Sequence, residues 1–332
     1  MSEPKPFYLP RQGVRDQESS EDVPEESTDD WQAPDYEVLD EDLHSRTGNF
    51  VFTIGNVGCG KSTLQTALVY RLWSREDLLF DFNHESNDQR HDALLQEWIL
   101  RLYKDGALPE RTKAGRLQEF CIAYGQKGKR TLDLNFLEIS GEDIKTIVPT
   151  IDVATQPTLH RQLEEYLKAD KKRINKRFIF VSDATAHLPD AARPEDEKFT
   201  EDMLFYALLR YLLGKDGLQM PKIQALFVAA KWDAAQSYFG TVERYCRTKF
   251  PRTRAVLNSD RCRTQYIPFS IGKIGEKTVG GMVESRVLAL ESRYVDLIIQ
   301  WIYHAFTGEQ LRNMRKVKPN LLDRVMRFAS GK

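Results

Sequence analysis

The 332-residue chain is predicted to form an α/β domain with a doubly wound, mostly parallel sheet, one antiparallel hairpin strand and helices on both faces. Three observations predict this class. Short apolar runs rich in aromatic and β-branched residues recur along the chain, separated by segments with apolar residues at helical spacing. Two of these runs are joined by a tight glycine turn, which indicates a hairpin. A glycine-rich turn also joins the first run directly to a helical segment.

The predicted strands are apolar runs that are either continuous, as in strands buried on both faces, or alternating. They cover residues 49–54, 117–124, 130–139, 177–183, 223–230 and 265–270. The predicted helices carry apolar residues three and four positions apart, so that one stripe faces the core. The clearest cover residues 62–73, 93–103, 202–213, 237–249 and 287–306.

Charge divides the chain into three predicted parts. Residues 1–42 hold 14 acidic and three basic side chains, too polar to bury a core, so residues 1–43 are predicted to be an acidic tail, disordered to about residue 30. Residues 44–308 are predicted to form the folded domain, and residues 309–332 a basic helix or tail. The sequence has no apolar run near the roughly 20 residues of a membrane span and no signal-peptide core, which predicts a cytoplasmic protein. The four cysteines are too widely spaced to indicate a zinc site or a disulfide scaffold.

The strongest motif is G-x-x-x-x-G-K-[ST] between the first strand and the first helix, the pattern of a phosphate-binding loop. Its glycines let backbone N–H groups surround phosphates, with the positive end of the helix behind them. Lys61 is expected to reach the β- and γ-phosphates, and Ser62 to ligate Mg²⁺. The candidate nucleotide-binding residues of the loop are Gly55, Asn56, Val57, Gly58, Cys59, Gly60, Lys61, Ser62 and Thr63. Cys59 is either a small residue that fits the turn or an oxidation-sensitive thiolate.

The order of motifs over residues 49–272 resembles the translation-factor-related (TRAFAC) class of P-loop GTPases. That order is a phosphate loop, a hairpin ending in x-x-x-Gly, a strand ending in Asp, a strand ending in Lys-x-Asp and a strand ending in Ser. Small GTPases and G-protein α subunits are familiar members, and the bacterial double-GTPase type of conflict and defence systems is the nearest look-alike. The resemblance implies a Ras-like G domain with insertions that binds GTP, GDP and Mg²⁺ and acts on an effector or activating protein.

Lys231 and Asp233 resemble the guanine-reading N-K-x-D motif of that class. A carboxylate accepts hydrogen bonds from guanine N1–H and its 2-amino group, which adenine lacks, and the lysine stem covers the base. Ala230 stands where the family has Asn, which removes a link between the base loop and the phosphate loop. Ser270 and Ile271 resemble the S-A-K loop that contacts guanine O6. A plain strand-to-helix turn is the other interpretation of residues 230–233.

The resemblance also implies residues that bind the metal ion and take part in hydrolysis. Glu138 takes the place of the D-x-x-G acid that holds Mg²⁺, and Gly141 that of the glycine at the γ-phosphate. Glu142 stands where the family often has the Gln that orients the attacking water, which implies slow hydrolysis. Thr112 is the candidate Mg²⁺ ligand of the first switch. With Lys61, these three residues (Thr112, Gly141 and Glu142) form the candidate catalytic set.

The leading hypothesis is an Mg²⁺-dependent GTP-hydrolysing switch with slow turnover that regulates a partner protein. A nucleotide-binding pseudo-GTPase scaffold is one alternative. An ATPase is another, because residues 58–63 also resemble the ABC-transporter loop, although the chain has no L-S-G-G-Q signature. A basic stretch over residues 168–177 is either a solvated face or a contact for a phosphate-rich partner; it has no nucleic-acid motif.

Overall fold

The computed structural model describes residues 47–82, 89–108, 118–139, 161–191, 195–215, 217–279 and 282–313. The chain divides into two units, Met1–Glu37 and Val38–Lys332, and every described residue belongs to the second. The predicted acidic tail and nearly all of the predicted basic C-terminal segment lie outside the described residues, so the division into three parts stays a prediction. No helix in the described part of the chain is long and apolar enough to cross a lipid bilayer.

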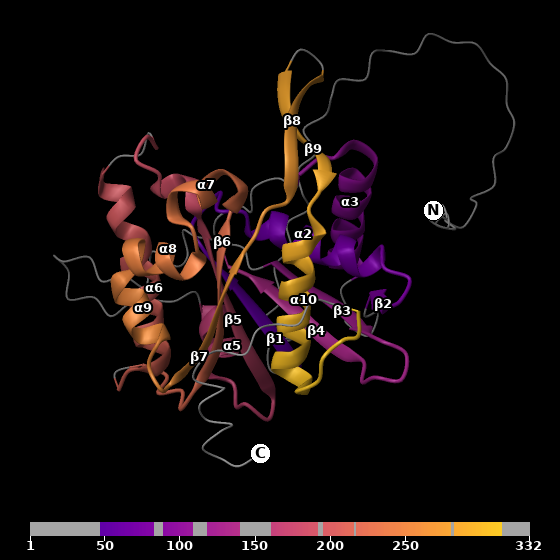
Figure 1. The fold of residues 1–332 in the computed structure, drawn as a ribbon. Helices are drawn as coiled ribbons and strands as arrows, with labels where there is room; N and C mark the ends of the chain where they lie inside the picture. The colour runs from indigo at the N-terminus through magenta and orange to yellow at the C-terminus, as the bar shows by residue number, and fades with distance from the viewer. Residues whose placement is uncertain are drawn as a thin grey trace, which may run out of the picture. The chain divides into compact units, whose positions relative to one another are not determined.

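A seven-stranded sheet in the order β2-β3-β4-β1-β5-β6-β7 forms the centre of the second unit (Figure 1). β3 runs antiparallel to both of its neighbours, β2 and β4, and all other adjacent pairs are parallel. The predicted fold class, a mostly parallel sheet with one antiparallel strand, is therefore confirmed. The strands are β1 (Gly48–Ile54), β2 (Leu79–Phe82), β3 (Gln118–Gly125), β4 (Leu132–Glu138), β5 (Ile174–Asp183), β6 (Ile223–Ala230) and β7 (Cys262–Pro268).

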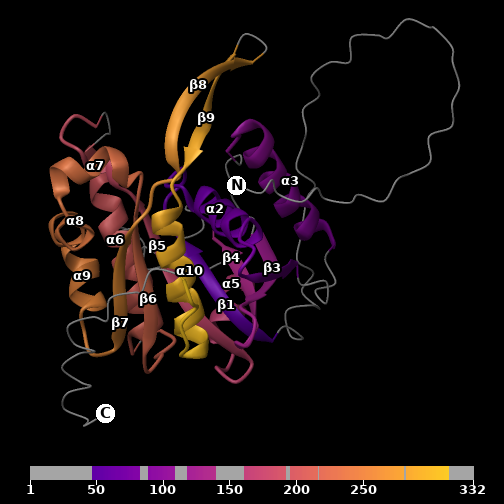
Figure 2. The same ribbon diagram turned by 45° about the vertical axis from the view of Figure 1, so that its right-hand side comes forward.

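Helices pack on both faces of this sheet, as Figure 2 shows. One face packs against α2 (Lys61–Trp73), α3 (Gln89–Asp105) and α10 (Ser292–Thr307). The other packs against α5 (Arg161–Lys168), α6 (Glu195–Leu213), α7 (Trp232–Phe239), α8 (Val242–Lys249) and α9 (Pro251–Leu257), with the short 3₁₀ helix η1 (Ala184–His187) after β5. Because the central strands are buried on both faces, they read as continuous apolar runs; β6 is Ile-Gln-Ala-Leu-Phe-Val-Ala-Ala.

One predicted helix is two helices in the structure. The helix expected over 237–249 is interrupted where Gly240, with φ 75°, ends α7 in a conformation that disfavours side chains. Thr241 then caps α8, because its Oγ1 accepts a hydrogen bond from the Arg244 N–H at 3.1 Å. The amphipathic spacing continued through this corner, so periodicity alone did not reveal the break.

The helix expected over 287–306 begins too early, because residues 287–290 belong to a strand. β8 (Gly272–Val279) and β9 (Met282–Leu290) form an antiparallel hairpin outside the main sheet, and α10 begins only at Ser292. Glu291 caps the helix by accepting a hydrogen bond from the Arg293 N–H at 2.8 Å. The sequence analysis also missed β2, α5 and α9.

The β8–β9 hairpin projects beyond the main sheet in both views (Figures 1 and 2). Its base is attached to the end of α3, where the Val287 N–H donates to Gly106 O at 2.8 Å and Ala107 bridges to Arg286. Gly106 has φ 66°, and a Cβ there would lie 2.3 Å from Val287 O, so only glycine fits this contact.

Candidate functional site

The phosphate-loop sequence has the local geometry that the motif predicts. β1 ends at Ile54, the turn follows, and α2 begins at Lys61. Gly58 and Gly60 have φ 74° and 99°, in the left-handed region that glycine enters at low cost. A Cβ on Gly55 would lie 2.3 Å from Val181 O and 2.5 Å from Cys59 Sγ, so a side chain there would clash. Glycine is therefore favoured at 58 and 60 by the backbone conformation and at 55 by the lack of space for a side chain.

Lys61 folds back over the loop. Its side chain is buried, and Nζ donates hydrogen bonds to Gly55 O at 2.9 Å and Asn56 O at 3.1 Å. The ammonium group therefore lies where a phosphate above the loop could reach it. Asn56 Oδ1 is buried and has no hydrogen-bond partner among the described residues. Such an acceptor can take a hydrogen bond from a water molecule or from a donor group of a ligand.

Ser62 and Glu138 come together although 76 positions separate them. Ser62 Oγ donates to Glu138 Oε1 at 2.8 Å. The carboxylate lies at the end of β4, is 1% exposed, and pairs in register with Thr53 of β1. A hydroxyl and a carboxylate oxygen are ligands that suit Mg²⁺, which usually keeps several water molecules and takes further ligands from phosphates. The described residues contain no group of three or more His, Cys, Asp or Glu side chains that could hold a metal by themselves.

A second part of the candidate site follows β6 and β7. Because these neighbouring strands are parallel, the loops after them leave the same edge of the sheet. Asp233 is exposed, and its Oδ1 accepts a hydrogen bond from Ser270 Oγ at 2.8 Å. Ser270 Oγ in turn accepts from the Gly272 N–H at 3.3 Å, and Ile271 is buried beside it. The predicted base-reading residues thus lie side by side.

Lys231 adopts a left-handed conformation with φ 53°, uncommon for a residue with a side chain. Its Nζ donates to Asp183 Oδ2 at 2.6 Å, while Oδ1 of the same carboxylate accepts hydrogen bonds from Thr185 N at 2.9 Å and Thr185 Oγ1 at 2.6 Å. Sequence reasoning missed Asp183 as the partner of Lys231. The available signal was that Asp183 and Ala230 end two strands that are neighbours in the sheet.

The two parts of the site come close together at Ala230. A Cβ built on Gly60 of the phosphate loop would lie 3.7 Å from Ala230 Cβ, which is van der Waals contact. Ala230 is buried and carries no hydrogen-bonding side-chain group, so this junction is apolar. The base-side loop therefore lies near the phosphate loop, close enough for a side chain at position 60 to reach Ala230.

Cys59 behaves as a small core residue. Its side chain is 2% exposed, and burial raises the pKa of the thiol to about 12, although the Lys61 ammonium opposes this shift. A thiol with so high a pKa stays protonated at neutral pH, whereas the thiolate is the reactive form. The interpretation of Cys59 as a residue that fits the turn is favoured over the oxidation-sensitive thiolate.

A buried polar network behind the site was also missed. Glu201 Oε2 accepts a hydrogen bond from Ser182 Oγ at 2.9 Å and lies 2.8 Å from His187 Nε2. The Tyr245 hydroxyl is 2.7 Å from Ser182 Oγ, and burial raises its pKa well above the usual value. This network joins η1, α6 and α8 behind the end of β5, next to Asp183. Its members are scattered in the sequence, and no spacing marks them.

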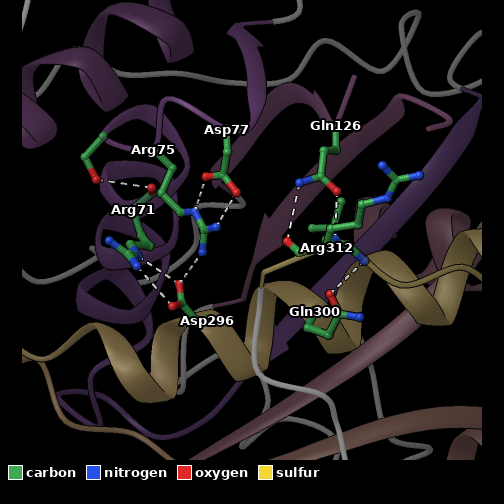
Figure 3. Close-up of polar contacts among 9 residues, drawn as sticks. Arg71, Arg75, Asp77, Gln126, Asp296, Gln300 and Arg312 are labelled. Atoms are coloured by element: carbon green, nitrogen blue, oxygen red, sulfur yellow. Dashed lines mark hydrogen bonds and ion pairs between the residues drawn. The ribbon is translucent and has the colours of Figure 1, made fainter. Parts of the chain in front are cut away.

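The helix that follows the phosphate loop is fastened to α10 by an ion-pair cluster (Figure 3). Arg71 donates through Nε and Nη2 to both oxygens of Asp296, at 2.8 and 3.0 Å. Arg75 Nη1 lies 3.7 Å from Asp296 Oδ1, and the same guanidinium binds Asp77. The cluster is partly buried and joins α2 to α10.

Three predicted site residues, Thr112, Gly141 and Glu142, lie outside the described residues. The structure brings together the others in three groups: the phosphate loop with Lys61, the Ser62–Glu138 pair, and the loops holding Lys231, Asp233, Ser270 and Ile271.

Comparisons with known proteins give only distant similarities. No family model matches the sequence, and no curated protein matches it. Among solved structures, the signal recognition particle receptor SRb-GTP/SRX complex from Chaetomium thermophilum is 15% identical over 69% of this chain and 93% of that one, with a TM-score of 0.39. The S. cerevisiae Ski7 GTPase-like domain bound to GDP and inorganic phosphate is 14% identical, with a TM-score of 0.34 over 70% of this chain and 45% of that chain. Bacterial selenocysteine-specific elongation factor EF-Sec is 13% identical, with a TM-score of 0.28 over 68% of this chain and 26% of that chain. The fold assignment accordingly rests on the sheet order and loop geometry above.

Proposed function

We propose that the protein is an Mg²⁺-dependent GTP-binding switch that hydrolyses GTP slowly and regulates a partner protein. The observation that supports this most directly is the 2.8 Å hydrogen bond between Ser62 and Glu138 beside a glycine-rich loop closed by Lys61. A hydroxyl and an ammonium group from the start of α2 and a carboxylate from the end of β4 then lie at the carboxyl edge of the sheet. That combination suits a polyphosphate with its metal ion.

In this proposal the loop amides and Lys61 bind the β- and γ-phosphates. Ser62 and Glu138 would hold Mg²⁺, which would neutralise charge developing on the transferred phosphoryl group. Thr112 would complete the metal ligands, Gly141 would contact the γ-phosphate, and Glu142 would take the place of the residue that orients the attacking water. A carboxylate at Glu142 in place of the usual amide is the reason for expecting slow turnover.

Guanine specificity is proposed to come from Asp233. Its exposed carboxylate can accept two hydrogen bonds from guanine N1–H and the 2-amino group, while Ser270 fixes its orientation through the 2.8 Å bond to Oδ1. Lys231, two positions before Asp233, donates a hydrogen bond to Asp183. Its aliphatic stem would cover the base. Ser270 and Ile271 would contact guanine O6 through their backbone.

The proposed output is a change of partner as loops order around the γ-phosphate. The resemblance to double GTPases suggests that the partner belongs to a conflict or defence system. A second candidate function is a pseudo-GTPase scaffold that binds nucleotide without turnover. The apolar junction at Ala230 and the longer acid Glu138 favour it, because both depart from the pattern of efficient GTPases.

The first experiment is titration of the full chain with fluorescent GDP, GTP and ATP in the presence of Mg²⁺, followed by phosphate release over hours. The proposal expects a guanine preference and slow release. Guanine binding without phosphate release in a single turnover would establish the scaffold instead, and equal or tighter ATP binding would remove Asp233 from a base-reading role. Lys61→Ala should abolish binding, and wild-type turnover in that variant would contradict the phosphate-loop assignment.

The base assignment has a sharper test in Asp233→Asn. The variant is expected to lose about 10- to 100-fold in GTP affinity, the value of a hydrogen bond to a charged group, and to gain affinity for xanthosine triphosphate. An amide can donate to the carbonyl that xanthine carries in place of the amino group. Asp260→Asn is the matched control, since Asp260 is an exposed carboxylate just before β7, at the opposite end of the strand. Unchanged GTP preference in Asp233→Asn would exclude this residue.

A further inference from the structure

A cavity of about 540 Å³ lies at the edge of the main sheet opposite the phosphate loop. Its walls come from the end of α5, the first residues of β5 and β6, the loop before β6, and Arg263 of β7. The phosphate loop follows the carboxyl end of β1, which runs parallel to β5. Because the cavity is lined by the amino ends of β5 and β6, the length of the strands separates it from the candidate nucleotide site.

The charge of this cavity is strongly positive. Six of its seventeen lining residues are basic and none is acidic; the six are Lys168, Lys171, Lys176, Arg177, Lys222 and Arg263. Two of the described acids lie near it: Glu164 is 2.8 Å from the Lys168 Nζ, and Asp170 Oδ1 accepts a hydrogen bond from the Lys172 N–H at 2.9 Å. Two carboxylates do not balance six cations, so the cavity attracts anions.

Three polar residues lie in a row across neighbouring strands at its floor. Gln224 of β6 pairs in register with Arg263 of β7, and the pairing of Phe178 with Ala225 puts Arg177 of β5 beside Gln224 on the other side. Adjacent strands are about 4.8 Å apart, so Arg177 and Arg263 leave the sheet on either side of Gln224. Gln224 Oε1 is buried and has no hydrogen-bond partner among the described residues. Such an amide can turn to donate to, or accept from, a bound ligand.

The Arg177 guanidinium is held in place by neutral groups. Nη1 donates to Asn175 Oδ1 and to Lys176 O, each at 2.8 Å, and Nε donates to Ala305 O at 3.1 Å. The same group lies 4.5 Å from the centre of the Phe306 ring. These contacts fix the orientation of the guanidinium, and because the acceptors are neutral they do not cancel its positive charge. Nη2 also donates to Ala305 O, so the guanidinium is fastened to α10 and acts on the cavity through its positive charge.

The ionisation of the buried cations agrees with an anion site. Burial, reinforced by the Arg173 guanidinium and opposed by Asp170, lowers the pKa of Lys176 to about 8. Burial, reinforced by Arg263, lowers the pKa of Arg177 to about 10. A bound anion would relieve the repulsion between these cations and favour their charged forms.

We propose that this cavity is a second ligand site, independent of the phosphate loop, and that it binds a small organic phosphate. The lysines bind the phosphate groups, the arginines add positive charge, and the partly buried side chains of Leu218 and Met220 pack against the organic part. The volume falls in the range of small-molecule pockets, about 300–1,000 Å³. The sequence analysis left the basic stretch over 168–177 open between a solvated face and a phosphate contact, and this proposal takes the second interpretation.

The test uses isothermal titration calorimetry on the full chain carrying Lys61→Ala, without Mg²⁺, so that the phosphate loop does not contribute. Inorganic tripolyphosphate is the probe, and binding at one site is expected. Lys171→Gln with Lys222→Gln should weaken it at least tenfold; both side chains are exposed, so the fold should persist. Arg263→Gln should weaken it likewise. The matched control is Lys127→Gln with Arg130→Gln, which removes two exposed cations from the turn between β3 and β4.

Two outcomes of this titration overturn the proposal: no binding of tripolyphosphate, or equal weakening in the cavity and control variants. The organic part is tested by comparing phenyl phosphate with inorganic phosphate, and the ring should tighten binding severalfold through contact with Leu218 and Met220. Equal affinity of the two overturns the organic assignment. A third outcome also overturns the proposal. If the parent protein sediments with phosphatidylserine vesicles and the Lys171→Gln/Lys222→Gln variant does not, the cavity binds a membrane surface and not a soluble ligand.

Discussion

Breaking the contact between Ser62 and Glu138 should have two separable effects. Ser62→Ala removes the donor of a 2.8 Å hydrogen bond to a carboxylate that is 1% exposed. A hydrogen bond to a charged group contributes about 1.5–3 kcal/mol, and a domain of this size loses about 2–4 °C in Tm per kcal/mol. The variant without nucleotide and metal is therefore expected to unfold about 3–12 °C lower than the parent protein.

The assay is differential scanning calorimetry in EDTA on Ser62→Ala, Glu138→Leu and the double variant. Because the double variant leaves neither partner uncompensated, its loss should be smaller than the sum of the single losses, by about 1–3 kcal/mol. Ser237→Ala, which removes an exposed hydroxyl from α7, is the control and should leave Tm unchanged. Strict additivity would refute the contact between Ser62 and Glu138.

The second effect appears only with metal. If Ser62 is an Mg²⁺ ligand, Ser62→Ala should abolish the gain in fluorescent GDP affinity that Mg²⁺ gives the parent protein. A variant that loses stability in EDTA but keeps the full Mg²⁺ effect would leave the hydrogen bond in place and remove Ser62 from the metal site. The two measurements therefore test the geometry and the proposed chemistry separately.

Three further predictions concern the surroundings of the site. Gly55→Ala should lower GDP affinity at least about tenfold by fluorescence titration, because its Cβ would lie 2.3 Å from Val181 O and displace the loop. Asp296→Asn should cost about 1–3 kcal/mol in urea unfolding, because it weakens the hydrogen bonds from Arg71, whose side chain is 28% exposed. Cys59, whose pKa is raised by burial to about 12, should resist iodoacetamide at pH 8 in the folded protein and react in urea, as followed by peptide mass mapping.

Each of these has an outcome that contradicts it. Normal GDP affinity in Gly55→Ala would contradict the predicted clash between the added Cβ and Val181 O. An unchanged urea midpoint in Asp296→Asn would mean that the cluster in Figure 3 contributes nothing to stability. For Cys59, the folded-state pKa lies above the ordinary 9.0, so its contribution to stability is full below pH 9 and falls as pH rises toward about 12. Rapid alkylation of the folded protein would contradict the buried thiol.

Local sequence signals predicted the phosphate loop, because each step of it has a residue-level cause. Glycines permit the positive φ values at Gly58 and Gly60, and apolar spacing marks the helix behind them. The resemblance to P-loop GTPases assigned both Ser62 and Glu138 to one metal site, and the structure brings these two side chains together. The same reasoning placed Asp233 near Ser270, at the ends of neighbouring parallel strands.

What the sequence did not predict depends on register and on side chains distant in the chain. The pairing of Lys231 with Asp183 requires knowing that β5 lies beside β6 with Asp183 opposite Ala230. The β8–β9 hairpin was concealed because the last residues of β9 extend the helical spacing of α10. The network around Glu201 and the row of Arg177, Gln224 and Arg263 are products of tertiary packing, which periodicity does not report.

The ion pair between Arg71 and Asp296 has a consequence for how the chain folds as it is synthesised. Its two ends are separated by 225 positions, so the helix behind the phosphate loop lacks this partner until almost all of the domain has left the ribosome. Contacts of such long range form late and carry a loop-closure cost. The early part of the chain, including β1 and α2, is therefore expected to wait in an incompletely packed state. During that interval chaperones would bind its exposed apolar face, and a chain interrupted before α10 would expose the same face permanently.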